Sequence, residues 1–245
     1  MILFNKISLN LHRKRNEEQI MLELDRDITL ALNGSDNIFW DNIMITTTST
    51  WSWTLVIIAM LIVMFKNNDI REFLLILISI ALMITVADRV CSGLVKPMVA
   101  RWRPTQDPQI MYMVDVVNGY RGGRFGFFSG HACNTFCVAT FMSLLFRHKT
   151  TTVVFYLWAA TTTFTRIYLG VHYFGDVTVG MLAGLFIGAA FYAIYDKLHD
   201  RLGSSRASSD KFTATGYLLT DLNAFLAVVF ANYILVVLIA IARGV

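Results

Sequence analysis

The chain has 245 residues, of which 56% are apolar and only 16% are charged, against roughly 25% charged residues in an average soluble domain. Its net charge is a mild +4 and its mean hydropathy is +0.55. These values exclude a disordered chain, an ordinary soluble enzyme and a basic nucleic-acid-binding tail, and they favour a protein that crosses the membrane several times.

The N-terminal segment, residues 1–35, differs from the rest of the chain. A short apolar stretch precedes the basic cluster 13–15, the reverse of the order in a secretory signal, so we expect no cleaved signal. In residues 17–33, apolar side chains recur every four positions between acidic ones, which predicts an amphipathic helix too charged to span a bilayer. It should lie on the membrane surface or pack on the bundle. Gly34 is a plausible C-cap, and the next element should start near Asp36.

Six later segments approach the ~20 apolar residues that a helix needs to cross a bilayer. They are 43–65, 73–95, 127–146, 153–168, 177–195 and 223–242. Because unpaired backbone amides are costly in lipid, each segment should be helical, which predicts an all-α polytopic bundle of about six spans. We expect a core at 36–195, and a C-terminal unit at 196–245 with a polar loop around 202–211 and the last span.

The most informative cluster lies between the fourth and fifth expected spans, where Arg166, His172 and Asp176 stand near one another. Four residues apart, His172 and Asp176 share one helix face, so the carboxylate can hold one ring nitrogen and leave the other as base or nucleophile. Gly170 allows a turn that brings Arg166 back beside His172. Taken alone, the cluster could equally be an ion pair at a helix end.

A second cluster, Ser129-Gly130-His131, opens the third expected span. Ser129 is a natural N-cap, and Gly130 lets a ligand approach the backbone closely. The free N–H groups at a helix start bind anions, and His131 in the first turn would lie within reach of such an anion. The alternative is a polar histidine that merely caps the span.

The long loop after the second expected span begins with the first cluster, Lys96 and Arg103. Arg103 can bind two phosphate oxygens at once, while Lys96 acts as a point charge. A basic loop beside a span could also simply contact lipid headgroups. Candidate headgroup contacts further along the loop are Tyr120, Arg121 and Arg124.

Together the clusters supply two histidines, one aspartate, one lysine, two arginines and one serine that could converge on one anion. The sequence shows no ligand cluster with metal-site spacing, no phosphate-binding P-loop and no CxxC among its three cysteines. We therefore expect no metal and no cofactor, so that side chains and backbone amides must neutralise the anion.

The three motifs resemble those of the type 2 phosphatidic acid phosphatase superfamily, which also includes the vanadium haloperoxidases. The family pattern is K-x6-R-P, then P-S-G-H, then S-R-x5-H-x3-D. The matching residues here are Lys96 to Arg103 and Pro104, then Phe128 to His131, then Thr165 and Arg166 to His172 and Asp176. The resemblance covers about residues 36–195. Phe128 replaces the usual proline and Thr165 the usual serine.

The resemblance implies a role for each residue. His172 would attack phosphorus and form a phosphohistidine, Asp176 would orient His172, and His131 would protonate the leaving oxygen and then activate water. The phosphoryl oxygens would be bound by Lys96, Arg103, Arg166, the Ser129 hydroxyl and the Gly130 amide. These roles agree with the general rule that preorganised donors meet the charge of a transition state.

Asp88 is an ionisable residue inside the second expected span, where such groups are usually functional. It lies eight residues before Lys96, about 12 Å along a helix. It could form a local pair with Arg89, or organise the motif cations from below.

These observations predict an integral-membrane, metal-independent lipid phosphatase acting through a phosphohistidine. Candidate substrates are a polyprenyl diphosphate such as undecaprenyl diphosphate, phosphatidylglycerol phosphate, phosphatidic acid and lipid A phosphate. A lipid phosphotransferase would use the same site. A haloperoxidase is disfavoured by the apolar composition. An anion transporter or channel would be favoured by discontinuous paired spans, which the sequence does not indicate.

The expected partners are a phosphorylated lipid and the surrounding membrane lipids, with no nucleic acid and no obligate protein partner. The positive-inside rule does not decide the orientation, because basic residues nearly balance across the two sides. The resemblance implies a multi-pass protein of the cell (inner) membrane, with its active site on the non-cytoplasmic face.

Overall fold

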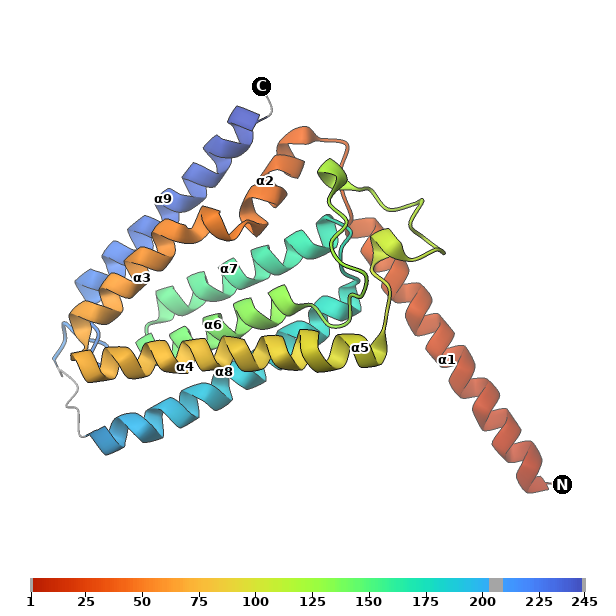
Figure 1. Ribbon diagram of the computed structural model, residues 1–245, viewed down its shortest axis with the longest axis horizontal. Helices are drawn as coiled ribbons and strands as arrows, with labels where there is room; N and C mark the ends of the chain where they lie inside the picture. Colours follow the sequence, from red (N-terminus) through yellow and green to blue (C-terminus); the bar gives the residue numbers. More distant parts are fainter. Residues whose placement is uncertain (1, 203–208, 244–245) are drawn as a thin grey trace.

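The computed structural model describes residues 2–202 and 209–243, and the described chain folds as a bundle of helices with one projecting helix (Figure 1). The bundle contains α3 (Thr54–Asn67), α4 (Ile70–Asp88), α6 (Gly130–Phe146), α7 (Lys149–Tyr168), α8 (Phe174–Leu202) and α9 (Leu219–Arg243). Its interior is filled by fully buried apolar side chains, among them Met64, Ile76, Met83, Phe141, Phe146 and Phe225. The middle of the polar loop expected around 202–211 lies outside the described residues.

Within the described ranges, four helical segments are long and apolar enough to cross a membrane. They are Thr50–Asn67, Ile70–Val99, Phe174–Arg201 and Leu219–Arg243. α6 is a shorter apolar helix, and the threonine-rich α7 packs beside it. The predicted all-helical, multi-pass architecture is therefore confirmed.

The first expected span, 43–65, is wrong as one continuous helix. The structure divides it into α2 (Ile38–Thr48), the 3-10 helix η1 (Thr50–Trp53) and α3. The Ser52 hydroxyl donates to the Thr46 carbonyl at 2.7 Å, and the Trp53 Nε1–H donates to the Thr47 carbonyl at 2.8 Å. Side chains thus take over the last carbonyls of α2, a competition that a count of apolar residues does not detect.

Close packing of α6 on α8 sets the geometry of the motif residues. Gly180, Gly184 and Gly188 recur every four positions, so they form one strip along α8. A Cβ atom at any of them would lie 2.4–2.6 Å from a backbone carbonyl oxygen of α6 or of its N-cap, so only glycine allows this approach. At the end of the strip the Ser129 N–H donates to the Asp176 carbonyl at 3.0 Å, which ties the start of α6 to the start of α8.

The long loop and the α7–α8 turn lie together at one end of the bundle (Figure 1). α4 continues into this end through the π-helical segment η2 (Arg89–Val95) and the short α5 (Lys96–Val99). The loop, which contains η3 (Pro104–Gln106) and η4 (Val117–Gly119), folds back on itself and hydrogen-bonds to the turn. Gly170 makes that turn with a φ of +65°, as predicted. All three motifs therefore reach the same end.

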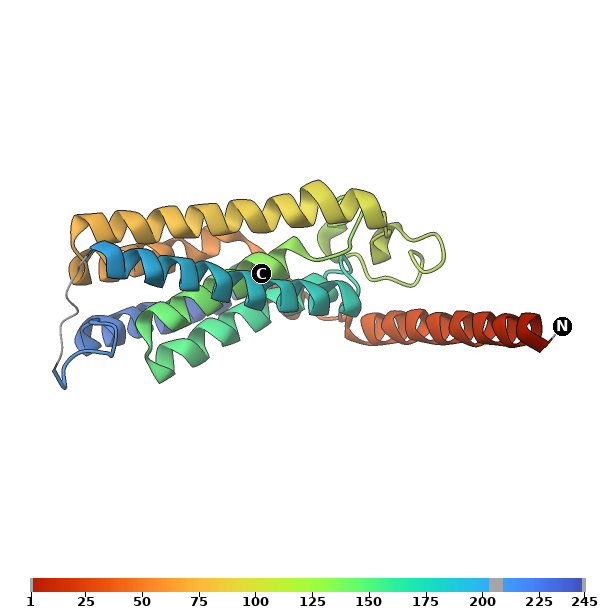
Figure 2. The ribbon, with the colours of Figure 1, turned by 90° about the horizontal axis from the view of Figure 1, so that it is seen from below.

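α1 (Ile2–Leu32) is longer than the amphipathic stretch expected at 17–33, and its N-terminal part projects away from the bundle (Figures 1 and 2). α1 contacts α7 and α8, and near its C-terminal end the Thr29 hydroxyl accepts the Phe174 N–H at 3.0 Å. The helix is followed by Gly34 in the left-handed region, as predicted. The N-cap of α2 is Asn37 and not Asp36, because the Asn37 side chain accepts the Phe39 N–H at 2.9 Å.

Candidate active site

Residues of all three motifs line one cavity of about 760 Å³. The motif residues on its wall are Lys96, Arg103, Gly130, His131, Arg166 and His172. From this polar end the cavity continues between the helices, where its walls are mainly apolar and include Val56, Met60, Leu77, Ile80, Val138 and Phe225. The convergence of three distant stretches, which the motif spacing predicted, is present in the fold.

His172 lies in the turn before α8, and not on the helix as its spacing from Asp176 predicted. Asp176 stands in the first turn of α8, where its Oδ2 accepts the Tyr173 N–H at 3.1 Å. The same oxygen is 3.5 Å from Nδ1 of His172, too far for a hydrogen bond, and this nitrogen has no other partner among the described residues. Both residues are almost completely buried, with 1% of His172 and 0% of Asp176 exposed. The carboxylate thus faces one ring nitrogen, although the backbone geometry differs from the expectation.

The other nitrogen of His172, Nε2, lies 3.2 Å from Nη1 of Arg103. A guanidinium can only donate, so this contact needs a lone pair on Nε2 and leaves the ring proton on Nδ1, facing Asp176. Burial, followed by the positive charges of Arg103 and Arg166, lowers the pKa of His172 well below the usual 6.5. The ring is therefore neutral at pH 7, with its lone pair directed at the cations, as a nucleophile requires.

Three cations line the cavity without a direct ion-pair partner. Among the described residues, no carboxylate lies within 4.0 Å of the charged groups of Lys96, Arg103 and Arg166. The Nε atoms of both arginines are buried and have no hydrogen-bond partner. A buried N–H group without an acceptor costs about 1–3 kcal/mol. The cluster is therefore built for a ligand rich in acceptor oxygens and negative charge, such as a phosphate.

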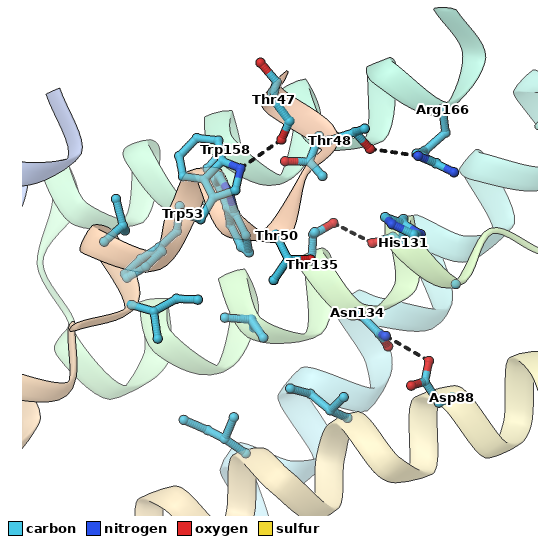
Figure 3. Close-up of a pocket in the computed structure, with 18 of the residues that line it drawn as sticks. Thr47, Thr48, Thr50, Trp53, Asp88, His131, Asn134, Thr135, Trp158 and Arg166 are labelled. Atoms are coloured by element: carbon cyan, nitrogen blue, oxygen red, sulfur yellow. Dashed lines mark hydrogen bonds between the residues drawn. The ribbon is translucent and has the colours of Figure 1, made fainter. Parts of the chain in front are cut away.

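Arg166 is oriented by two neutral hydroxyl groups. Its Nη1 donates to Oγ1 of Thr48 at 2.7 Å (Figure 3), and its Nη2 donates to the hydroxyl of Tyr120 at 3.0 Å. Thr48 ends α2, so the break in the first span brings a hydroxyl to this arginine. Tyr120, one of the predicted headgroup contacts, lines the cavity.

The other two predicted headgroup contacts, Arg121 and Arg124, lie outside the cavity wall. Arg121 donates from Nη1 to the carbonyl of Thr105 at 3.0 Å. The guanidinium of Arg124 lies over the ring of Trp102, 4.6 Å from its centroid. Both arginines therefore stabilise the loop in this structure.

The start of α6 meets the cavity through Gly130 and His131. Ser129 is the N-cap, as predicted, and its Oγ accepts the Ala132 N–H at 3.4 Å. The Ser129 side chain is completely buried and does not line the cavity. The glycine backbone and the histidine side chain thus form the cavity-facing part of this motif.

Arg101 is a site residue that the motifs do not include. Its Nη1 donates to Oδ1 of Asp176 at 2.9 Å, and its Nη2 donates to Oδ2 of Asp25 on α1 at 2.6 Å. Oδ1 of Asp25 accepts the Gly175 N–H at 2.7 Å, in the first turn of α8. The proximity of Arg101 to Arg103 was a weak signal, but nothing in the sequence linked it to a helix 76 positions earlier.

In the part of the chain that the structure describes, no three His, Cys, Asp or Glu side chains come together as a metal-ion site would need. The three cysteines, Cys91, Cys133 and Cys137, are buried and form no disulfide. The described groups that surround the cavity's polar end are thus cations and imidazoles, a set suited to an anion.

The family model of the PAP2 superfamily matches residues 72–200, just over half of the chain. The chain belongs to the PAP2 superfamily. Every motif residue from Lys96 to Asp176 lies in the matched range, so the resemblance drawn from the motifs is confirmed. Asp25 and all of α9 lie outside it.

The PAP2 chain is also similar to two named relatives. It is 39% identical to a lipid A 4'-phosphatase of Bacteroides thetaiotaomicron, over 76% of this chain and 83% of that protein. It is 35% identical to a lipid A 4'-phosphatase of Porphyromonas gingivalis, over 76% of this chain and 80% of that protein.

A solved structure shares the PAP2 fold. The crystal structure of a transmembrane PAP2-type phosphatidylglycerolphosphate phosphatase from Bacillus subtilis aligns with a TM-score of 0.57 and 22% identity, over 73% of this chain and 88% of that one. At that identity the match shows the fold alone. Taken with the family and the two relatives, it identifies this PAP2 protein as a multi-pass membrane phosphatase.

Proposed function

We propose that this lipid phosphatase removes the phosphate from a lipid A-type glycolipid, with His172 as the nucleophile. The observation that carries the proposal is the single cavity that joins an unpaired cation cluster to apolar walls among membrane-spanning helices. The cations suit a phosphate and the walls suit acyl chains. The names of the two relatives support the glycolipid as substrate. The proposed location is the inner membrane, with the site at its non-cytoplasmic face.

In the first step the Nε2 lone pair of His172 forms a bond to phosphorus while the ester P–O bond breaks. His131 gives a proton to the departing oxygen, which leaves as the alcohol of the dephosphorylated lipid. Asp176 stabilises the positive charge that develops on the phosphohistidine ring. The phosphoryl oxygens are met by Lys96, Arg103, Arg166 and the Gly130 amide at the α6 N-terminus.

In the second step a water molecule attacks the phosphohistidine. His131, which lost its proton in the first step, accepts one from this water as the new P–O bond forms and the N–P bond breaks. Inorganic phosphate leaves, and His172 returns to its neutral form with the lone pair on Nε2. The net reaction consumes one lipid phosphate and one water and yields one lipid alcohol and one phosphate.

The test is a phosphate-release assay with purified protein in detergent micelles. The buffer contains EDTA, which removes divalent cations. The substrates are lipid A phosphate, phosphatidic acid, phosphatidylglycerol phosphate and undecaprenyl diphosphate. We expect kcat/KM for lipid A phosphate to exceed that for the other lipids by about tenfold or more, because its sugar provides groups for specific hydrogen bonds. The His172→Ala protein serves as the blank.

Four results of this assay would each contradict a different part of the proposal. Failure to release phosphate from any lipid would contradict hydrolysis. Recovery of the phosphoryl group on a second lipid would identify a phosphotransferase instead. Activity that disappears in EDTA and returns with a divalent cation would overturn metal independence. Faster turnover of another lipid would replace the glycolipid as the substrate.

The link from α1 to the site provides a second prediction. Asp25→Asn weakens the contacts of this side chain with Arg101 and with the start of α8, so Asp176 and His172 are held less firmly. We expect kcat to fall about tenfold, a barrier increase of about 1.4 kcal/mol, with KM nearly unchanged. Steady-state kinetics on the best lipid of the panel measures both.

The matched control is Asp27→Asn, which makes the same charge change on an exposed side chain of α1. It should leave kcat within twofold of the wild type. Equal losses in both variants would mean that the charge of α1, and not the contact between Asp25 and Arg101, is responsible. An unchanged kcat in Asp25→Asn would remove α1 from the support of the site.

A further inference from the structure

Asp88 and Asn134 form a polar pair in the cavity that the reaction above does not use. Nδ2 of Asn134 donates to Oδ1 of Asp88 at 2.9 Å, and both residues line the cavity (Figure 3). The local pair with Arg89 expected from the sequence is wrong, because no cation among the described residues, Arg89 included, lies within 4.0 Å of the Asp88 carboxylate. The other expectation, that Asp88 organises the motif cations from below, stays a prediction. An ionisable group in a membrane-spanning helix is costly and usually functional.

The pair lies deeper in the bundle than the phosphate-binding end. Asn134 follows His131 by three residues on α6, about 4.5 Å along the helix. One turn further from the cations, the cavity residues are apolar on both helices, Ile84 on α4 and Val138 on α6. The pair therefore stands between the phosphate site and the apolar walls, at the level of the group that joins a lipid's phosphate to its chains.

The free positions of the pair are acceptors. Oδ1 of Asn134 is buried and has no hydrogen-bond partner. An ionised Asp88 carboxylate can only accept. A matching ligand must therefore donate an O–H or an N–H. An acylated amino sugar carries hydroxyl and amide N–H groups close to its phosphate ester, whereas a diacylglycerol phosphate and a polyprenyl diphosphate carry no such donor beside theirs.

We propose that Asp88 and Asn134 form a subsite for the O–H and N–H donors of a phosphorylated, acylated amino sugar. This inference rests on the proposed function, because it names the feature that selects the substrate of the same site. A lipid without donors leaves the buried Oδ1 of Asn134 without a partner, which costs more than a matched pair gains. The subsite thus disfavours donor-free lipid phosphates.

A purely structural tie between α4 and α6 would predict a different outcome, since polar pairs also join helices in membranes. Loss of such a tie would lower the turnover of every lipid alike. Loss of a subsite would lower turnover only of lipids that use it. The ratio of kcat/KM values for two lipid classes therefore separates the two roles.

The experiment compares lipid A phosphate with phosphatidic acid in the same micelles, for the wild type, Asp88→Asn and Asn134→Ala. We expect each variant to lower the ratio of the two kcat/KM values by at least about tenfold, with phosphatidic acid turnover equal to that of the wild type or higher, because the unpaired acceptor that penalises this lipid is removed. Thr85→Val is the control, because Thr85 lies on α4, donates to the Ala81 carbonyl and does not line the cavity.

A wild-type measurement keeps the inference testable if a variant fails to fold. Methylating the sugar hydroxyl and the amide nitrogen nearest the phosphate removes the donors from the substrate, and should lower wild-type kcat/KM by about tenfold or more. Equal losses on both lipids, or an unchanged ratio with full activity on the methylated lipid, would overturn the subsite and leave the phosphatase proposal intact. A wild type that hydrolyses only donor-free lipids would overturn the glycolipid proposal itself.

Discussion

Replacing His172 with alanine should lower phosphate release by about 10⁴-fold or more, because it removes the group that bonds to phosphorus. The remaining cations can still hold a lipid phosphate, so substrate binding should weaken far less than turnover. The measurement is the initial rate of phosphate release at saturating lipid, set against a binding curve for the same lipid. His148→Ala is the control, because His148 caps α7 outside the cavity.

Folding must be separated from chemistry in this test, because His172 is buried. The variant should insert into membranes and elute as the wild type does, with a melting temperature within a few degrees of it. Turnover above one hundredth of the wild-type rate in such a folded variant would remove His172 from the role of nucleophile. Loss of both activity and folding would direct the test to His172→Gln, which is expected to keep the fold but not the activity.

If neutral His172 is the nucleophile, its protonation state sets how activity depends on pH. Its pKa is lowered by burial and by neighbouring cations, so the ring stays neutral as the pH falls through the usual range of histidine. The nucleophile is therefore lost only when the pH drops well below 6.5. This direction follows from the geometry, since Arg103 faces Nε2 in the buried turn.

Much of the site could be predicted from residue type and spacing. Lys96, Arg103, His131 and His172 were expected at one anion site, and they line one cavity. The prediction of one shared site succeeds because each motif lies at the end of an apolar segment, and helices of similar length bring their ends to the same level of a bilayer. Spacing did not give the local backbone, so His172 was expected on a helix but lies in a turn.

The remaining features depend on contacts between segments far apart in the chain. The sequence around Asp25 predicts an ordinary amphipathic surface helix. No neighbouring residue indicates that Asp25 pairs with Arg101. The break after Thr48 was missed because hydropathy counts charge and not hydroxyl groups that bind backbone carbonyls. The four-residue spacing of Gly180 and Gly184 was a readable signal of close helix packing that could have placed α6 on α8.

His131→Ala tests the second histidine and should lower lipid turnover by about 10²–10⁴-fold, because it removes the proton donor and the base of the proposed reaction. An aryl phosphate such as p-nitrophenyl phosphate, whose leaving group needs little protonation, should still phosphorylate His172 in this variant. Hydrolysis of the phosphohistidine still lacks its base. We therefore expect the ³²P label from this substrate to accumulate on the His131→Ala protein as an acid-labile, alkali-stable adduct.

The double variant makes this experiment decisive for both residues. His131→Ala combined with His172→Ala should carry no label, since the atom that receives the phosphoryl group is absent, whereas the wild type should show label only transiently. Label on the double variant would mean that another side chain is the nucleophile. A His131→Ala protein that turns over the aryl phosphate without holding label would mean that water is activated elsewhere in the cavity. The same cation cluster would then serve a different pair of acid and base.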